Sequence, residues 1–174
     1  MSTNFKAIFL TLIISVAFML TSCSSTTKKA ENEGDETITS VADTAQDQDF
    51  EVNADSDSGK TGAIQTIFFA FNSSQLSERA RNTLKDNAAF LKANPQIEIQ
   101  IEGHADERGG VQFNLALGEQ RSAAVKKYLV ALGIDGNRIS TISFGKERPV
   151  AFGHDEESWS KNRRGNFVIS AIAK

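Results

Sequence analysis

Apolar residues recur with two different periods in the C-terminal two thirds of the chain, and the shorter period predicts strands. In Gln96–Glu102 every second residue is isoleucine, so one face of the predicted strand is buried and the other is wetter. Three further stretches are rich in β-branched and aromatic residues, which favour strands. These predicted strands are Ile64–Phe71, Ile139–Phe144 and Phe167–Ile172.

The longer period, close to that of an α-helix, predicts two helices. In the first, apolar residues recur over Leu76–Leu91, Ser74–Ser77 offers N-cap residues, and Asn94-Pro95 ends the helix. The second extends from about Gln112 to Leu132. Gly133 then supplies the glycine that commonly follows the last turn of a helix.

The predicted elements follow the order β-α-β-α-β-(short α)-β, with the short helix in the polar connection between the last two strands. Each long helix has one apolar stripe, and the strands have buried faces that need a cover. The helices are therefore expected to pack on one face of a mixed sheet. The predicted fold class is α/β, a two-layer sandwich in one domain that spans residues 62–174.

The N-terminal 22 residues have the pattern of an export signal. Lys6 supplies a positive charge, and Ala7–Leu20 is a 14-residue stretch with only two polar residues. A membrane-spanning helix needs about 20 apolar residues, so this stretch is too short to span and fits a cleaved signal peptide. We therefore predict a signal peptide over residues 1–22.

Cys23, the only cysteine of the chain, directly follows this segment. Leu20-Thr21-Ser22-Cys23 resembles the bacterial lipobox, in which small residues admit the cleavage enzyme and the cysteine thiol takes a diacylglycerol. Cleavage exposes the cysteine amine for a further acyl chain such as palmitate, and two or more chains anchor a protein lastingly. The alternative is an ordinary signal peptide with a chance cysteine. An aspartate at Ser24 would resemble the inner-membrane retention signal, so serine there favours the outer membrane.

Residues 23–61 are predicted to form a disordered acidic linker. Residues 24–61 carry ten acidic residues and three lysines, and their scattered apolar residues follow neither a helical nor a strand period. Such a segment buries too little apolar surface to offset the entropy lost on ordering. It is expected to act as a leash for the domain that follows, or as a plain spacer.

Residues 62–174 hold 15 basic and 12 acidic residues, a mildly basic balance that suits a ligand bearing carboxylates. No dense stripe of lysine and arginine with interleaved aromatics occurs, which argues against nucleic-acid binding. This part has no cysteine, its two histidines are isolated, and its serines show no nucleophile-elbow motif. We therefore expect no metal, no cofactor and no catalytic activity.

The most specific motif covers the loop after the second predicted strand and the helix that follows. Gly103–Leu129 reads GHADERGGVQFNLALGEQRSAAVKKYL and resembles the peptidoglycan-binding signature of the OmpA C-terminal domain family. More narrowly, it is similar to the peptidoglycan-associated lipoproteins (Pal) of the Tol system. The resemblance extends over residues 62–174, with further matching pieces at Ile67–Phe71, Ser143–Pro149, Gly153–Glu156 and Ser160–Arg164.

The resemblance implies a pocket for the peptide stem of peptidoglycan, chiefly for the free end of meso-diaminopimelate. That end carries an ammonium and a carboxylate on one carbon, so the pocket needs an anion and a cation close together. By the family motif, Asp106 takes the ammonium, and Arg121 takes the carboxylate through its planar fork. The alternative for these two residues is an ordinary surface ion pair.

Five further residues are assigned to the pocket by the same resemblance. Asn114 is expected to tie the loop to the helix through its amide, and Leu117 either walls the pocket or belongs to the core. Arg108 is expected to reach a second carboxylate, and Phe71 to lie near the pocket mouth. Asn72 stands where the family often has aspartate. The asparagine keeps a hydrogen-bond acceptor but lacks the negative charge.

As a whole, the resemblance implies a lipid-anchored outer-membrane protein that faces the periplasm and tethers the outer membrane to the cell wall. Such a protein supports envelope integrity and cell division, with a TolB-like periplasmic partner. A structural lipoprotein of the same family without a Tol partner is the alternative. Trp159 is interpreted either as a partner anchor or as a lid over the sheet edge. Arg163-Arg164 is interpreted either as a contact to wall or partner or as a solvated charge pair.

Overall fold

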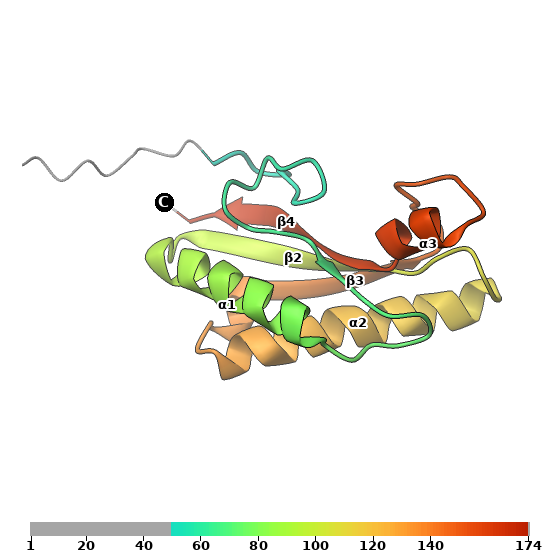
Figure 1. Ribbon diagram of the computed structural model, residues 1–174. Helices are drawn as coiled ribbons and strands as arrows, with labels where there is room; N and C mark the ends of the chain where they lie inside the picture. Colours follow the sequence, from blue (N-terminus) through green and yellow to red (C-terminus); the bar gives the residue numbers. More distant parts are fainter. Residues whose placement is uncertain (1–49, 174) are drawn as a thin grey trace, which may run out of the picture. The chain divides into compact units, whose positions relative to one another are not determined.

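The computed structural model describes residues 50–173, which form a four-stranded sheet with helices packed against it (Figure 1). The strands are β1 (Ile67–Phe68), β2 (Ile97–His104), β3 (Ile139–Gly145) and β4 (Arg164–Ile172). The helices are α1 (Glu78–Ala93), α2 (Val111–Ala131) and α3 (Glu156–Asn162), with a 3₁₀ turn at Gly136–Arg138.

The sheet is mixed, with the spatial order β1-β4-β2-β3. β4 pairs antiparallel with both β1 and β2, whereas β2 and β3 are parallel and are joined through α2. In Figure 1, α1 and α2 lie together on one face of the sheet, and α3 lies at the end where β2 finishes and β4 begins. The predicted α/β sandwich and its order of elements are confirmed.

The ends of both long helices follow the signals in the sequence. The hydroxyl of Ser77 accepts a hydrogen bond of 3.2 Å from the backbone N–H of Ala80, which caps α1 at its N-terminus. Asn94 then caps the C-terminal end of α1. After α2, Gly133 has a φ of +93°, a left-handed conformation that glycine adopts without strain.

The core lies between the sheet and the two long helices. The isoleucines of β2 point into it together with one stripe of α1, which explains the two periods in the sequence. The buried apolar side chains of the sheet and the two long helices are Ile67, Ala80, Leu84, Ala88, Leu91, Ile97, Ile99, Ile101, Val125, Leu129, Ile139, Phe167 and Ile169.

β1 is much shorter than the strand predicted over Ile64–Phe71. Before β1, a side chain of α1 takes the place of a strand partner. The amide of Asn87 accepts a bond of 2.9 Å from the N–H of Gln65 and donates one of 2.8 Å to its carbonyl. After β1, the carbonyl of Ala70 accepts a bond from Arg121. The apolar residues of Ile64–Phe71 follow the pattern of a strand. Before and after β1, however, these backbone groups bond side chains and not a neighbouring strand.

Residues 50–61 are packed onto the domain, so the predicted boundary at residue 62 lies too late in the chain. The N–H groups of Asn53 and Ser56 each donate a bond of 2.8 Å to β4, which continues the strand edge beyond the short β1. Ala54 and Thr61 are buried. Hydrogen bonds to β4 help to order residues 50–61, although the composition of this segment does not indicate them. The predicted signal peptide, Cys23 and the rest of the predicted linker lie outside the described residues.

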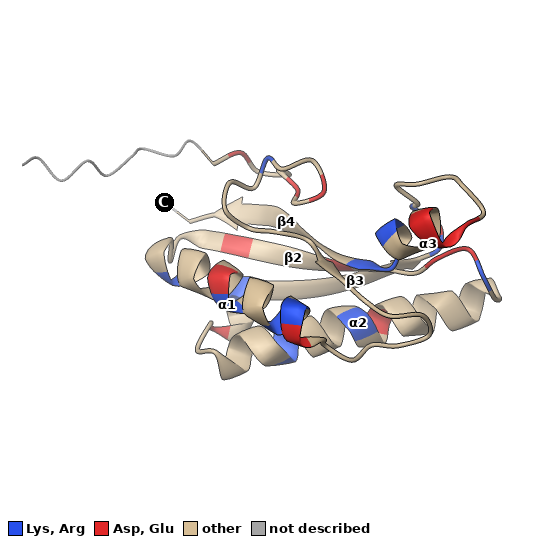
Figure 2. Ribbon diagram, viewed as in Figure 1, with Lys and Arg blue, Asp and Glu red and all other residues tan. Residues whose placement is uncertain are grey.

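Charged residues are not spread evenly over this domain. Figure 2 shows acidic and basic residues close together where the loop after β2 meets α3. Among the helices within residues 50–173, none combines the length and the apolar character needed to cross a membrane.

Candidate functional site

Direct backbone contact between β2 and α2 fixes the loop that carries the predicted motif. A Cβ atom on Gly103 would overlap the carbonyl group of Gly118, and a Cβ atom on Gly118 would overlap the hydroxyl of Ser143. Glycine at both positions therefore lets α2 lie directly against the end of β2. This close approach brings side chains of α2 to the loop at residues 105–110.

A cavity of about 150 Å³ lies at this junction, and the structure brings all seven predicted pocket residues to it. Phe113 on α2, which is 54% exposed, is a further aromatic wall that the sequence reasoning missed. The seven predicted residues in the lining are Phe71, Asn72, Asp106, Arg108, Asn114, Leu117 and Arg121.

Asp106 is a nearly buried anion, only 4% exposed. One carboxylate oxygen accepts bonds from the backbone N–H of Arg108 at 3.1 Å and from its Nε at 3.2 Å. The other oxygen accepts from Nη2 of Arg108 at 2.6 Å and from Nη1 of Arg163 at 3.3 Å. Burial by itself raises the pKa of Asp106, but these charged donors outweigh it and hold the pKa below its ordinary value.

Arg121 is fully buried in the wall of the cavity and joins three backbone segments. Its guanidinium donates to the carbonyls of Ser73 at 2.9 Å, His104 at 2.6 Å and Ala70 at 3.0 Å. Burial lowers its pKa to about 10, so the group stays charged at neutral pH. In the structure, three N–H donors of this guanidinium bond backbone carbonyls. The predicted contact of Arg121 with a ligand carboxylate stays a prediction.

Asn114 and Leu117 lie one turn apart on α2 and face the loop. The side-chain amide of Asn114 donates a bond of 3.0 Å to the carbonyl of Arg108, which is the predicted tie between helix and loop. Leu117 is 8% exposed and lines the cavity, so it serves both as core and as wall. Both residues hold the loop against α2.

Asn72 follows the short β1 in a left-handed conformation, with a φ of +48°. Asn and Asp tolerate this region better than other residues with a side chain, since their short polar groups bond locally. The backbone therefore accounts for an Asn or Asp at this position. The neutral amide lines the cavity without adding a negative charge to it.

The guanidinium of Arg108 contacts two aromatic rings from distant parts of the chain. Its guanidinium carbon is 3.9 Å from the ring centroid of Phe71 and 4.0 Å from that of Trp159 on α3. The indole N–H of Trp159 donates a bond of 2.8 Å to Glu107, which also bonds Nδ1 of His154 at 2.8 Å. Glu107, the residue before Arg108, thus links the loop to Trp159 of α3 and to His154 ahead of that helix.

Arg163 and Arg164 are both buried, so the interpretation as a solvated charge pair is wrong. Arg163 donates to Asp106, to Glu156 and to the carbonyl of Phe69. Arg164 donates to Asp57 at 2.6 Å. Neighbouring side chains on a strand point to opposite faces, so each arginine meets a different acidic partner. Sequence reasoning did not assign Arg163 to the site, because its partner Asp106 is 57 residues away.

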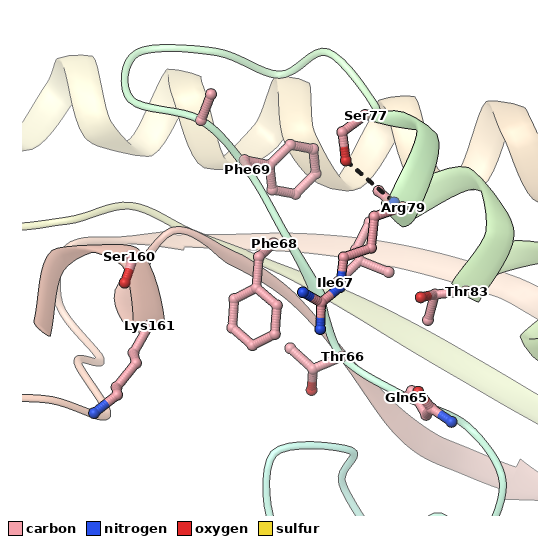
Figure 3. Close-up of a pocket in the computed structure, with 12 residues that line it drawn as sticks. Gln65, Thr66, Ile67, Phe68, Phe69, Ser77, Arg79, Thr83, Ser160 and Lys161 are labelled. Carbon is pink, nitrogen blue, oxygen red and sulfur yellow. Dashed lines mark hydrogen bonds between the residues drawn. The ribbon is translucent and has the colours of Figure 1, made fainter. Parts of the chain in front are cut away.

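A larger groove of about 530 Å³ runs along β1 and the N-terminal end of α1 (Figure 3). Its lining includes Arg79 and Lys161, and Figure 3 shows Arg79 reaching from α1 toward β1. No carboxylate is among the lining residues. The groove therefore lacks the anion that a zwitterionic head group requires, and the smaller cavity fits that chemistry better.

Comparison with known proteins shows the family to which the chain belongs. The sequence profile of the OmpA family matches residues 68–163, a range that contains all seven predicted pocket residues. A peptidoglycan-associated lipoprotein of Brucella melitensis is 40% identical over 153 residues, or 87% of this chain and 86% of the relative. The chain belongs to the peptidoglycan-associated lipoproteins of the OmpA family.

Two further similarities show how far the OmpA-family match extends. A peptidoglycan-associated lipoprotein of Pseudomonas aeruginosa is 47% identical over 109 residues, which is 63% of this chain and 64% of the relative, just under two thirds. The crystal structure of the peptidoglycan-associated lipoprotein from Burkholderia pseudomallei is 43% identical, with a TM-score of 0.58. It covers 59% of this chain and 87% of that chain.

Within the described part of this OmpA-family chain, no group of three or more His, Cys, Asp or Glu side chains is arranged to hold a metal ion. Charged side chains line the cavity. It offers one carboxylate and two guanidinium groups, and the chemistry that these groups support is recognition of a ligand bearing both charges.

Proposed function

We propose that the protein binds the stem peptide of peptidoglycan without cleaving it and thereby tethers the outer membrane to the cell wall. The observation that carries the proposal is the single cavity shared by Asp106, Arg108 and Arg121. The names of the relatives support an association with peptidoglycan, and the charges in the cavity support the finer assignment.

The free end of meso-diaminopimelate matches these charges. Its ammonium binds Asp106, which is ionised at neutral pH because its pKa is held below the ordinary value. Its carboxylate binds a guanidinium at the cavity. Arg121 uses three donors on carbonyls, and a guanidinium has five, so donors are left for a group that enters the cavity.

The size of the cavity supports recognition of one head group. A volume of about 150 Å³ is below the range of roughly 300–1,000 Å³ that is usual for pockets of drug-sized ligands. The cavity therefore takes the end of the stem peptide, and the glycan strand stays outside. Asn72 in place of aspartate leaves Asp106 as the anion of this lining.

The membrane side of the tether rests on the N-terminal sequence. We propose that residues 1–22 are removed, that Cys23 carries the acyl chains, and that an acidic linker joins it to the domain that begins near residue 50. The protein then faces the periplasm from the outer membrane. Replacing Cys23 by Ser removes the thiol that takes the acyl chains, so the protein is expected to be lost from the outer-membrane fraction; a Ser24→Ala control stays there.

A TolB-like periplasmic protein is the proposed partner, within a Tol-Pal-like system that supports envelope integrity and cell division. The alternative is a structural lipoprotein of the OmpA family without a Tol partner. Cross-linking in cells followed by co-purification separates the two. Catalysis is not part of the proposal, and release of soluble muropeptides by the purified protein would contradict it.

Sedimentation with purified sacculi tests the binding. Asp106→Asn keeps the shape of the side chain but removes the charge, so we expect the bound fraction to fall at least tenfold. Asp86→Asn, an exposed change on α1, serves as the control and is expected to bind like the parent protein. Sacculi with amidated diaminopimelate are expected to bind the parent weakly. Equal sedimentation of Asp106→Asn and the parent would rule out the assigned pocket.

A further inference from the structure

The side chain of Arg108 is held by groups from three separate segments. Phe71 follows β1, Trp159 belongs to α3, and Arg108 itself lies in the loop after β2. The two rings lie at 3.9 Å and 4.0 Å from the guanidinium carbon, so the planar group is held between them. The side chain is nevertheless 31% exposed, which leaves it an open path toward solvent.

The same guanidinium binds both carboxylate oxygens of Asp106. Nε of Arg108 bonds one carboxylate oxygen and Nη2 bonds the other, in the forked arrangement of a strong ion pair. Arg163 and the backbone N–H of Arg108 complete the shell around both oxygens. A ligand ammonium that binds Asp106 must therefore take the place of the Arg108 guanidinium.

We propose that Arg108 is an exchangeable counter-ion of Asp106, an inference that rests on the proposed function. The ligand ammonium replaces the guanidinium at Asp106. The displaced guanidinium slides outward between Phe71 and Trp159 and binds the carboxylate of the same ligand. Trp159 is the positioning residue, because it keeps the guanidinium in the plane where it meets the ligand.

The exchange conserves charge at the site. One internal ion pair opens, and two ion pairs to the ligand replace it, with ammonium on Asp106 and carboxylate on Arg108. No unpaired charge is left behind, and the stacking on the two rings is kept throughout. A ligand with an amidated carboxylate also opens the pair of Arg108 with Asp106, but its neutral amide forms no ion pair with Arg108. The site therefore binds the amidated ligand more weakly.

The orientation of Trp159 is itself fixed. Its indole N–H bonds Glu107, the residue next to Arg108 in the chain, and His154 bonds the same carboxylate. The ring of Trp159 thus covers Arg108 in the binding loop, and its interpretation as a partner anchor stays a prediction.

Intrinsic fluorescence gives a direct test, because Trp159 is the only tryptophan of the chain. The stem tripeptide L-Ala-γ-D-Glu-meso-diaminopimelate is titrated into the full mature protein in detergent. We expect a saturable change of emission for the parent and its loss in Arg108→Gln. Arg79→Gln, on the larger groove, is the control that keeps the change. An emission change that persists in Arg108→Gln would overturn the proposal.

Calorimetry with the tripeptide and its amidated form tests the discrimination. The parent is expected to prefer the free carboxylate at least tenfold, and Arg108→Gln to reduce this ratio below about threefold. Trp159→Leu is expected to weaken binding about fivefold, as loss of a cation–π contact does, and Trp159→Phe to keep most of the affinity. Urea unfolding of each variant shows that the fold is retained.

The outcomes separate this inference from the proposed function. If the parent binds neither sacculi nor the tripeptide, the proposed function fails and this inference fails with it. If the parent binds both but Arg108→Gln keeps the parent's preference for the free carboxylate, only the exchange of Arg108 is overturned.

Discussion

Arg121 donates a hydrogen bond of 2.6 Å to the carbonyl of His104, two residues before Asp106 in the chain. This bond joins α2 to the end of β2 at the point where the binding loop begins. The same guanidinium also holds the segment after β1 through the carbonyls of Ala70 and Ser73. Arg121 is thus a structural clamp of the site as well as part of its wall.

The first prediction concerns this clamp. Arg121→Lys is expected to destabilise the domain by about 3 kcal/mol or more, because one ammonium cannot reach three carbonyls and each buried acceptor left without a donor costs about 1–3 kcal/mol. Urea unfolding followed by circular dichroism measures the loss. Arg79→Lys, the same change at an exposed arginine of α1, is the matched control, whose midpoint should stay close to that of the parent. Equal midpoints for Arg121→Lys and the parent would show that the carbonyls find other donors.

The second prediction concerns the contact between β2 and α2. Gly103→Ala is expected to lower both stability and sacculus binding, because the added Cβ meets the carbonyl of Gly118 and pushes the helix away from the strand. Overpacking of this kind costs about 1–3 kcal/mol. Gly110→Ala is the control, since a Cβ at Gly110 meets nothing within 4 Å. Thermal unfolding and sedimentation with sacculi follow both effects, and unchanged behaviour of Gly103→Ala would contradict the close contact.

The third prediction uses the two histidines, whose pKa values shift in opposite directions. Hydrogen bonding to Glu107 raises the pKa of His154 above 6.5, whereas burial lowers the pKa of His104 below 6.5. An NMR pH titration of the two imidazoles is expected to resolve them on either side of 6.5. Glu107→Gln should return only His154 toward 6.5.

The same shift gives a stability effect with a definite sign. A folded-state pKa raised above the unfolded value means that the pair of His154 with Glu107 contributes fully below pH 6.5. Its contribution is lost as the pH rises through the raised pKa of His154. The difference in unfolding midpoint between the parent and Glu107→Gln should therefore shrink at alkaline pH; a difference that grows there would contradict the pairing.

The fourth prediction concerns Asn72. Asn72→Asp adds a negative charge to the cavity lining while keeping a residue that tolerates the left-handed backbone. We expect affinity for the stem tripeptide to rise about two- to fivefold at low ionic strength, the gain of one partly exposed ion pair, and to fall back in high salt. Calorimetry at two salt concentrations measures it. Weaker binding by Asn72→Asp would show that the ammonium lies away from this residue.

Local patterns in the sequence determined much of this protein. The alternation in Gln96–Glu102 and the helical spacing over Leu76–Leu91 depend on near neighbours, so the fold class, the core faces and the helix ends could be predicted. The resemblance to the OmpA family assigned Asp106, Asn114 and Arg121 to one pocket, and the cavity is lined by all three.

Only the tertiary structure decided how these charges are paired. Arg108 lies beside Trp159, and Arg163 bonds Asp106 across 57 residues of sequence. The order of residues 50–61 also depends on a distant partner, β4. Such contacts form between segments that are distant in the sequence and meet only on folding. The periodic pattern of apolar residues within one segment therefore cannot predict them. For the same reason, the sequence predicted Arg121 as a site residue but not that its guanidinium bonds three backbone carbonyls.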